Sequence, residues 1–184
     1  MIEFETNFEN PSVYDGDIAT GRTNRHVVEW TANESTIVSR KIFIHHQLVN
    51  PLNELKLEAA KYGFDLCVCS GFRSYDQQAT IWNEKLSGRR DVLSDNGKVL
   101  NLAGLSDYQK VEAIMRWSAL PGTSRHHWGS DIDVFDGAAI PTNYQLRLVP
   151  EETSEDGVFG PMHAWLDKIL DSNNGFFRPY NCDN

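Results

Sequence analysis

Residues 64–86 read FDLCVCSGFRSYDQQATIWNEKL and join two different hydrophobic periods without a linker. Apolar and polar residues alternate through 64–69, which predicts a half-buried β-strand. Residues 76–86 place Ala79, Trp82 and Leu86 on one helical face, and the pair Ser87-Gly88 ends the pattern. The sequence therefore predicts a strand that leads directly into a helix, with a tight turn at Gly71 between them.

Three further helices are expected elsewhere in the chain. The first begins with Asn50 as N-cap and Pro51 at the first helical position, and it ends at Gly63. The second begins at a capping box of Ser106 and Gln109. The third runs from residue 161 to about residue 171. The expected buried faces are Leu52, Leu55, Ala59 and Tyr62; Tyr108, Val111, Ile114 or Met115, and Trp117; and Trp165, Ile169 and Leu170.

The remaining segments predict short strands and loops. Residues 130–135 and 144–149 have strand patterns, and Asn96-Gly97 indicates a hairpin. The acidic run at 150–157 is expected to be a solvated loop, and residues 1–45 an N-terminal arm with a strand or two, packed on the domain. Because helices alternate with short strands and the hairpin signal favours antiparallel pairing, the predicted fold class is α+β.

Bulk properties exclude several classes of function. The 184 residues suffice for one domain with an arm, and the net charge of -9 argues against nucleic acid or an anionic membrane as the main partner. No stretch approaches the roughly 20 apolar residues of a membrane span, and no signal peptide is visible at the N-terminus. Cys67 and Cys69 share one side of a strand and are too extended to bridge, so all three cysteines are expected to be free thiols. Nothing in the sequence indicates an oligomeric state.

The stretch TSRHHWGSDIDVFD at 123–136 carries the residue types of a metal site. A histidine at a turn and an aspartate on the following strand can converge on one ion, which makes His126 and Asp133 candidate ligands. On that strand Asp131 and Asp133 would share a face. A capped turn without metal remains the alternative from spacing alone, and His127 is expected to pack or to support the site.

The stretch SGFRSYDQQ at 70–78 contains a second group of candidate residues at a strand end. Arg73 presents a planar fork suited to a carboxylate or a developing oxyanion. The alternative interpretation is a structural salt bridge at Arg73 and a helix surface contact at Gln78.

Together the two stretches resemble the paired signatures of a family of zinc peptidases. SGFRSYDQQ is similar to Ser-Gly-Tyr/Phe-Arg-Ser with a glutamine five residues after the arginine, and SRHHWGSDID is similar to Ser-x-His-x-x-Gly-x-x-x-Asp. On these motifs the chain is identified as a member of the VanY-type D-alanyl-D-alanine carboxypeptidases. Their wider group holds lysostaphin-type enzymes, D-Ala-D-Ala dipeptidases and the hedgehog signalling domain.

The resemblance implies a small antiparallel sheet flanked by helices, with residues 46–184 as the zinc peptidase domain. It implies that His126 and Asp133 ligate zinc. Arg73 would hold the substrate or stabilise the tetrahedral oxyanion, and Ser124 and Gln78 would position the peptide. The implied reaction is hydrolysis of the bond before the C-terminal D-alanine of a peptidoglycan stem peptide, with zinc polarising the carbonyl and a glutamate taking the proton from water.

The sequence departs from the family pattern in two places. Asp131 stands where the family has a small residue. Its carboxylate is expected either to support a ligating histidine or to compete with Asp133 for the metal, and Asp133 is kept as the ligand. The family's third ligand and base lie in a Glu-x-Trp-His segment after a stretch like GFFRPYN, and these 184 residues contain no such segment. Truncation is the expected explanation, and four histidines are weaker substitutes for the third ligand. They are His26, His45, His46 and His163.

Two alternative functions stay open. The same motifs serve L-alanyl-D-glutamate endopeptidases of the endolysin type, which cut another bond of the stem peptide. A non-catalytic peptidoglycan-binding member is the other alternative, because the third ligand and base are missing. The family implies a location in the cell envelope or periplasm; without a visible signal, the cytoplasm is the alternative.

Overall fold

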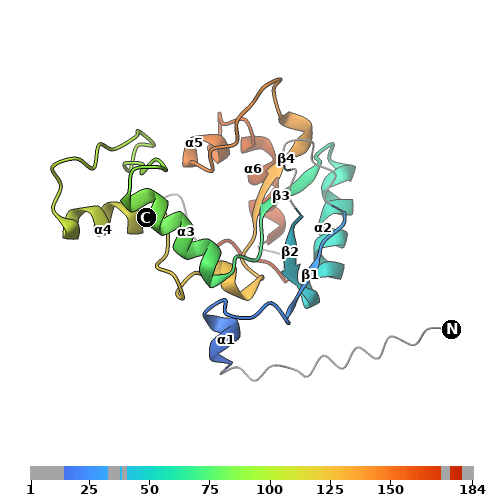
Figure 1. Ribbon diagram of the computed structural model, residues 1–184. Helices are drawn as coiled ribbons and strands as arrows, with labels where there is room; N and C mark the ends of the chain where they lie inside the picture. The colour runs from blue at the N-terminus through green and yellow to red at the C-terminus, as the bar shows by residue number, and fades with distance from the viewer. Residues whose placement is uncertain (1–14, 33–37, 39–40, 171–174, 180–184) are drawn as a thin grey trace. The chain divides into compact units, whose positions relative to one another are not determined.

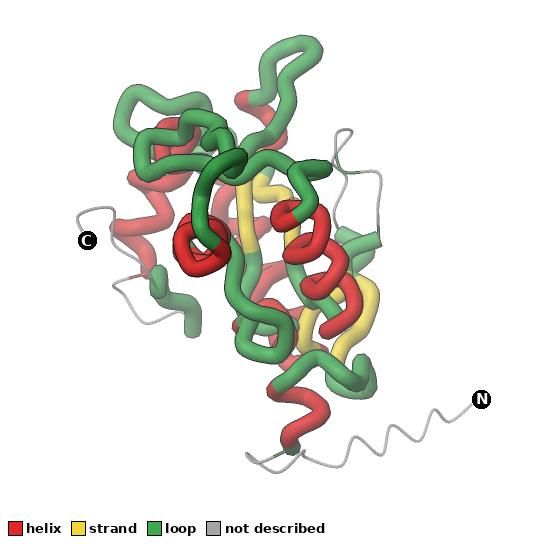
Figure 2. Tube along the Cα trace, turned by 60° about the vertical axis from the view of Figure 1, so that its left-hand side comes forward, coloured by secondary structure: helices red, strands yellow, loops and turns green. Residues whose placement is uncertain are grey.

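The computed structural model describes residues 15–32, 38, 41–170 and 175–179, and Figure 1 labels their helices and strands. Short strands alternate with helices along the chain, and loops make up a large share of it, as the green segments of Figure 2 show. The α-helices are α1 (Gly16–Ala19), α2 (Val49–Lys61), α3 (Tyr75–Leu86), α4 (Asp107–Met115), α5 (Pro150–Thr153) and α6 (Gly160–Leu170). The 3-10 helices are η1 (His46–Leu48), η2 (Arg125–Trp128) and η3 (Gly137–Ala139). The strands are β1 (Val27–Glu29), β2 (Phe43–His45), β3 (Leu66–Ser70) and β4 (Asp133–Asp136).

The strands form two small sheets, β1 with β2 and β3 with β4, and the second pair is antiparallel. This arrangement confirms the α+β class. None of the helices in the described ranges has both the length and the apolar character needed to cross a membrane.

The chain divides into two compact units that interleave in sequence. The first unit comprises Met1–Val28, Phe43–His46 and Gly71–Asp131, and the second comprises Glu29–Ile42, Gln47–Ser70 and Ile132–Asn184. The expected division into an arm of residues 1–45 and a domain of residues 46–184 stays a prediction.

The second unit is built around the pairing of β3 with β4. Leu66 pairs with Asp136, Cys67 with Phe135, Val68 with Val134, and Ser70 with Asp133, with a register irregularity between Val68 and Ser70. Every residue of β3 is buried, so the prediction of a half-buried strand was wrong. Helix α2 packs against β3, and Cys67, Cys69, Phe135 and Phe159 form a shared core cluster. Both cysteines are free thiols, as expected, and Cys182 lies outside the described residues.

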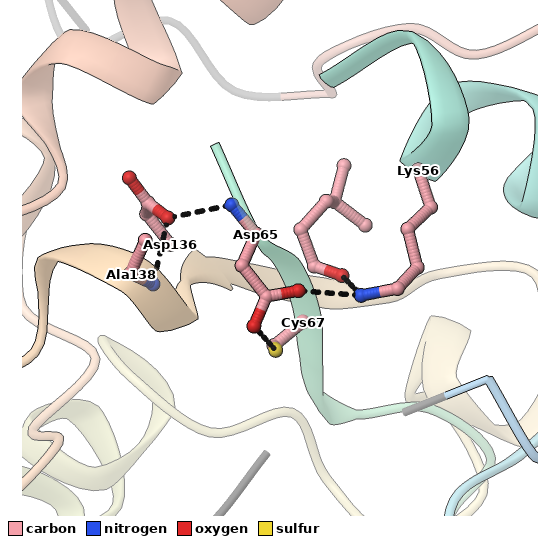
Figure 3. Close-up of polar contacts among 6 residues, drawn as sticks. Lys56, Asp65, Cys67, Asp136 and Ala138 are labelled. Atoms are coloured by element: carbon pink, nitrogen blue, oxygen red, sulfur yellow. Dashed lines mark hydrogen bonds and ion pairs between the residues drawn. The ribbon is translucent and has the colours of Figure 1, made fainter. Parts of the chain in front are cut away.

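A polar network closes the end of this pairing where β3 begins (Figure 3). Lys56 Nζ lies 2.6 Å from Asp65 Oδ1 and donates to the Leu66 carbonyl at 3.0 Å. The Asp136 carboxylate accepts from the backbone N–H groups of Asp65 at 2.9 Å and Ala138 at 3.0 Å. Burial alone would raise the pKa of Asp65, but hydrogen bonds from Lys56 and Cys67 and the charge of Lys56 outweigh it and lower that pKa. The network therefore fixes the register at the end of the strand pair away from Asp133.

Helix α2 begins two residues earlier than predicted and without a side-chain cap. Its N-cap is Leu48, which makes no side-chain capping bond, so the assignment of Asn50 as N-cap was wrong. The chain enters α2 directly from the 3-10 helix η1, and the preceding turn takes the place of a capping side chain. Leu52, Leu55 and Ala59 are buried as expected, whereas Tyr62 is 60% exposed.

In the first unit, the helix starts were predicted more accurately than the buried faces. Helix α4 has the predicted capping box of Ser106 and Gln109, and α3 has a further one of Ser74 and Gln77. Leu86 and Tyr108 are exposed, whereas α3 buries two polar residues, Gln78 and Lys85, beside Trp82. The hairpin signal at residues 96–97 corresponds to one antiparallel bridge between Leu93 and Val99.

Residues 144–149 do not form the predicted strand, because they wrap around a buried carboxylate. Glu152 is 5% exposed and accepts from the hydroxyl of Tyr144 and from three backbone N–H groups. Leu148 adopts a φ of 56°, which a strand does not allow. The acidic run was therefore wrongly predicted as wholly solvated.

Candidate functional site

The SGFRS turn begins where β3 ends. Within the second unit, Ser70 is the last residue of β3 and pairs with Asp133, the first residue of β4. The backbone carbonyl of Asp133 accepts from the Cys69 thiol at 3.3 Å. The antiparallel pairing thus places the candidate ligand Asp133 at the strand end from which the chain continues toward Arg73.

A buried glutamine orients the side chain of Arg73 within the first unit. The guanidinium donates to Gln78 Oε1 at 2.8 Å, and Gln78 Nε2 donates to the Ala119 carbonyl at 2.6 Å. Gln78 is fully buried, so its interpretation as a surface contact is excluded. Because both ends of the amide are engaged, Gln78 holds Arg73 in one direction and also fixes residue 119 of the segment that leads to the second motif.

The second motif lies on η2, whose backbone bonds directly to the first motif. Ser124 is the N-cap of η2 and is 4% exposed, and His126 lies in its first turn. The Arg73 backbone N–H donates to the His126 carbonyl at 3.0 Å. Within the first unit, the structure therefore brings together Arg73, Gln78, Ser124 and His126.

The ring of His126 is oriented by a backbone carbonyl. Its Nδ1–H donates to the carbonyl of Asp131 at 2.9 Å. In the neutral ring this bond puts the proton on Nδ1 and the lone pair on Nε2, which is the tautomer that an Nε2-bound metal requires.

Asp131 meets this site through its backbone rather than through its carboxylate. The carboxylate lies 3.5 Å from Arg125 Nε. Since β4 begins at Asp133, Asp131 precedes the strand, and the predicted common strand face of the two aspartates does not form. Asp131 closes the first unit and Asp133 belongs to the second.

The turn after η2 requires glycine at position 129. Gly129 has a φ of 67°. A Cβ on it would lie 2.6 Å from Val27 Cγ1 and 2.9 Å from the backbone nitrogen of His45. Because residues of β1 and β2 lie this close to Gly129, the motif has no room for a side chain at this position.

His127 is buried and both of its ring nitrogens are used. Its Nδ1–H donates to the carbonyl of Arg73 at 2.6 Å, and its Nε2 accepts from the N–H of Gly122 at 3.0 Å. Burial lowers the pKa of His127, and the charges of Arg73 and His126 lower it further against the opposing bond to the Arg73 carbonyl. This neutral ring joins the two motifs, as its expected packing role requires.

The four histidines expected as weaker substitute ligands have other contacts. His163 is buried, and its Nδ1 accepts from Arg178 at 3.1 Å. His26 donates through Nε2 to the His127 carbonyl, and His45 and His46 stack with ring centroids 4.5 Å apart. Over residues 15–32, 38, 41–170 and 175–179, no three His, Cys, Asp or Glu side chains form a group that could hold a metal ion.

Lys85 is a polar residue near this site that sequence reasoning missed. It is 9% exposed and donates to Ser118 Oγ at 2.7 Å, next to the residue held by Gln78. Burial lowers the pKa of Lys85, and the charges of Arg90 and Arg73 add to the effect. The available signal in the sequence was its spacing: Lys85 follows Gln78 by seven residues, or two turns, and so lies on the same face of α3.

Comparisons with known proteins agree with the motifs. Residues 41–184 match the family model VanY, described as D-alanyl-D-alanine carboxypeptidase. An uncharacterized protein of Haemophilus influenzae is 42% identical over 104 residues, which cover 56% of this chain and 68% of that protein.

Two solved structures share the fold. VanYB in complex with D-alanine-D-alanine has 24% identity and a TM-score of 0.53, covering 82% of this chain and 68% of that one. The LdcB LD-carboxypeptidase has 22% identity and a TM-score of 0.51, covering 84% and 57%. A VanY D,D-pentapeptidase mutant in complex with Zn(II) has 23% identity and a TM-score of 0.44, covering 67% and 62%. On the match of the family model, the chain belongs to the VanY D-alanyl-D-alanine carboxypeptidase family.

Proposed function

We propose that this chain is a zinc-dependent D,D-carboxypeptidase that hydrolyses the bond before the C-terminal D-alanine of peptidoglycan stem peptides. Family membership supports the peptidase class. The observation that carries the proposal is the tie between the motifs, in which the Arg73 backbone N–H donates to the His126 carbonyl at 3.0 Å. This bond holds Arg73 beside His126. The proposed reaction needs a guanidinium for the carboxylate or oxyanion and an imidazole for zinc.

The proposed zinc ligands are His126 and Asp133. The fit of His126 is supported by its Nδ1–H bond to the Asp131 carbonyl, which favours the metal-binding tautomer. Asp133 supplies a carboxylate, the other ligand type of such sites. When bound, zinc would polarise the scissile carbonyl and lower the pKa of a water molecule. The third ligand and the base belong to the Glu-x-Trp-His segment of the family pattern.

The remaining proposed roles belong to polar side chains of the first unit. Arg73 is held by Gln78 at 2.8 Å, so its guanidinium can receive a carboxylate or an oxyanion without reorienting. Ser124 is proposed to position the peptide near its terminal carboxylate. The expected place of action is the cell envelope, where stem peptides occur.

The test is release of D-alanine from a stem pentapeptide by the protein, with zinc added. D-Alanine release that Arg73→Gln abolishes, while Arg90→Gln leaves it unchanged, would support the proposal. Cleavage between L-alanine and D-glutamate instead would identify the endopeptidase alternative. Zinc binding that survives both His126→Ala and Asp133→Ala would refute the ligand assignment.

A non-catalytic peptidoglycan-binding role is the second candidate. It is favoured by the lack of a three-residue metal group within the described ranges. Binding of a pentapeptide without turnover in the zinc-loaded protein would establish this role and exclude the peptidase.

A further inference from the structure

The segment 15–28 lies outside residues 41–184, the part that matches the family model, yet it packs on both motifs. The segment and the motif residues that it touches all belong to the first unit. Helix α1 contacts η2, the helix that carries His126. The Trp128 indole N–H donates to the Ala19 carbonyl at 3.3 Å. The segment therefore contacts η2 at Trp128, the last residue of that helix.

Gly21 is the point of closest approach. It is buried, has a φ of 71°, and accepts from the backbone N–H of Tyr75 at 2.8 Å. A Cβ on Gly21 would clash with His127 Nδ1 and would lie 2.7 Å from His127 Cγ and 2.9 Å from Tyr75 N. Only glycine allows the segment to touch the first motif and the His127 ring at once.

A second bond from the segment holds the backbone of His127. His26 is 2% exposed and donates through Nε2 to the His127 carbonyl at 2.9 Å. The carbonyl of His26 accepts in turn from the Nδ1–H of His46 at 3.1 Å. The ring and the backbone of His127 are thus both fixed from the N-terminal side.

His127 transmits this packing to the candidate site. Its ring donates to the carbonyl of Arg73, and it follows His126 directly in the chain. A displaced His127 ring would release the Arg73 carbonyl and would move the peptide unit that joins residues 126 and 127.

We propose that residues 19–26 form a strap that positions Arg73 and His126 for the reaction, with Gly21 and His127 as positioning residues. The inference rests on the proposed function for its catalytic consequence, but the contacts that it invokes are measurable without turnover. It adds a segment outside the matched family region to the framework of the site.

The matched test compares Gly21→Ala with Gly104→Ala in the full chain. Both glycines have positive φ, 71° and 88°, but a Cβ at Gly104 meets nothing within 4 Å. Backbone strain is therefore common to both variants, and only Gly21→Ala meets the His127 ring. The readouts are amide hydrogen exchange at Arg73 and Gly122, and kcat and KM for D-alanine release.

The strap predicts faster exchange at Arg73 and Gly122 in Gly21→Ala, by about tenfold, and unchanged exchange there in Gly104→Ala. It also predicts a fall in kcat larger than any change in KM. Equal exchange at these amides in the two variants would overturn the proposal. If the unmodified protein shows no turnover, the proposed function fails while the exchange comparison still decides on the strap.

His127→Asn and His127→Phe provide a second comparison should Gly21→Ala fail to fold. Asparagine keeps a donor at the Nδ1 position toward the Arg73 carbonyl, whereas phenylalanine keeps only the ring volume. Protection of the Arg73 segment and kcat should be retained better in His127→Asn. Better retention in His127→Phe would contradict the positioning role.

Discussion

The guanidinium of Arg73 donates a hydrogen bond from Nη1 to Oε1 of the fully buried Gln78, and these two atoms lie 2.8 Å apart. The pair joins the turn after β3 to the first turns of α3. Its amide also holds the carbonyl of Ala119, so one side chain connects both segments that bear on the candidate site.

Replacing Gln78 by methionine should therefore misdirect Arg73 and leave the Ala119 carbonyl without its donor. We expect kcat/KM for the proposed reaction to fall by about 10- to 100-fold. The free energy of unfolding should fall by about 1–3 kcal/mol. Gln77→Met is the control, since Gln77 serves the capping box and its loss should affect helix stability alone. Equal kcat/KM in the two variants would argue against the orienting role.

Glu152→Gln should destabilise the second unit markedly. Each oxygen of this buried carboxylate accepts two hydrogen bonds, and a glutamine would present an NH2 group to two of those donors. We expect a loss of about 2–4 kcal/mol in urea unfolding. The neighbouring Glu151 is exposed, and Glu151→Gln should change stability by no more than about 0.5 kcal/mol. Similar losses in both variants would show that the buried network is unimportant.

His26 should make stability depend on pH on the acid side. Burial lowers the pKa of His26 below its ordinary value of 6.5, with the charges of Arg25 and His46 adding to this against the bond to His127. Below pH 6.5 the unfolded chain then binds protons that the folded chain does not, so the free energy of unfolding decreases as pH falls. His26→Gln keeps an Nε2 donor without a titrating ring, and its unfolding free energy should vary less between about pH 5 and 7. An unchanged slope would contradict this assignment.

Cys67 should resist alkylation in the native protein. Burial raises the pKa of its thiol to about 12, with the Asp65 charge and the hydrogen bond to Asp65 adding to the effect. Iodoacetamide at about pH 8 should therefore modify this residue only after unfolding. Peptide mapping of native and denatured samples checks the result, and rapid native labelling would show that β3 opens readily.

Local signals were predicted well because they depend on neighbours in sequence. Helix α3, the capping box of Ser106 and Gln109, and the free thiols of β3 all follow from side chains a few residues apart. The two motifs likewise indicated the family without reference to tertiary contacts.

The errors came from groups that only the tertiary structure brings together. Glu152 organises residues 144–149 into a loop through bonds that an alternating pattern cannot reveal. Tyr108 is 72% exposed although its spacing favoured the core, and the buried Lys85 is satisfied by a hydrogen bond that it donates to Ser118 Oγ. The support of His126 by a backbone carbonyl, rather than by the Asp131 side chain, is invisible in sequence for the same reason.

The register irregularity between Val68 and Ser70 determines how the strand delivers the turn that follows it. Val68 faces Val134, but the next residue of β4, Asp133, is paired with Ser70 and not with Cys69. Cys69 is thus the extra residue of a β-bulge between these two pairs. Deleting Cys69 would leave a continuous ladder of the remaining pairs, and the SGFRS segment would then leave a straighter strand in a different direction.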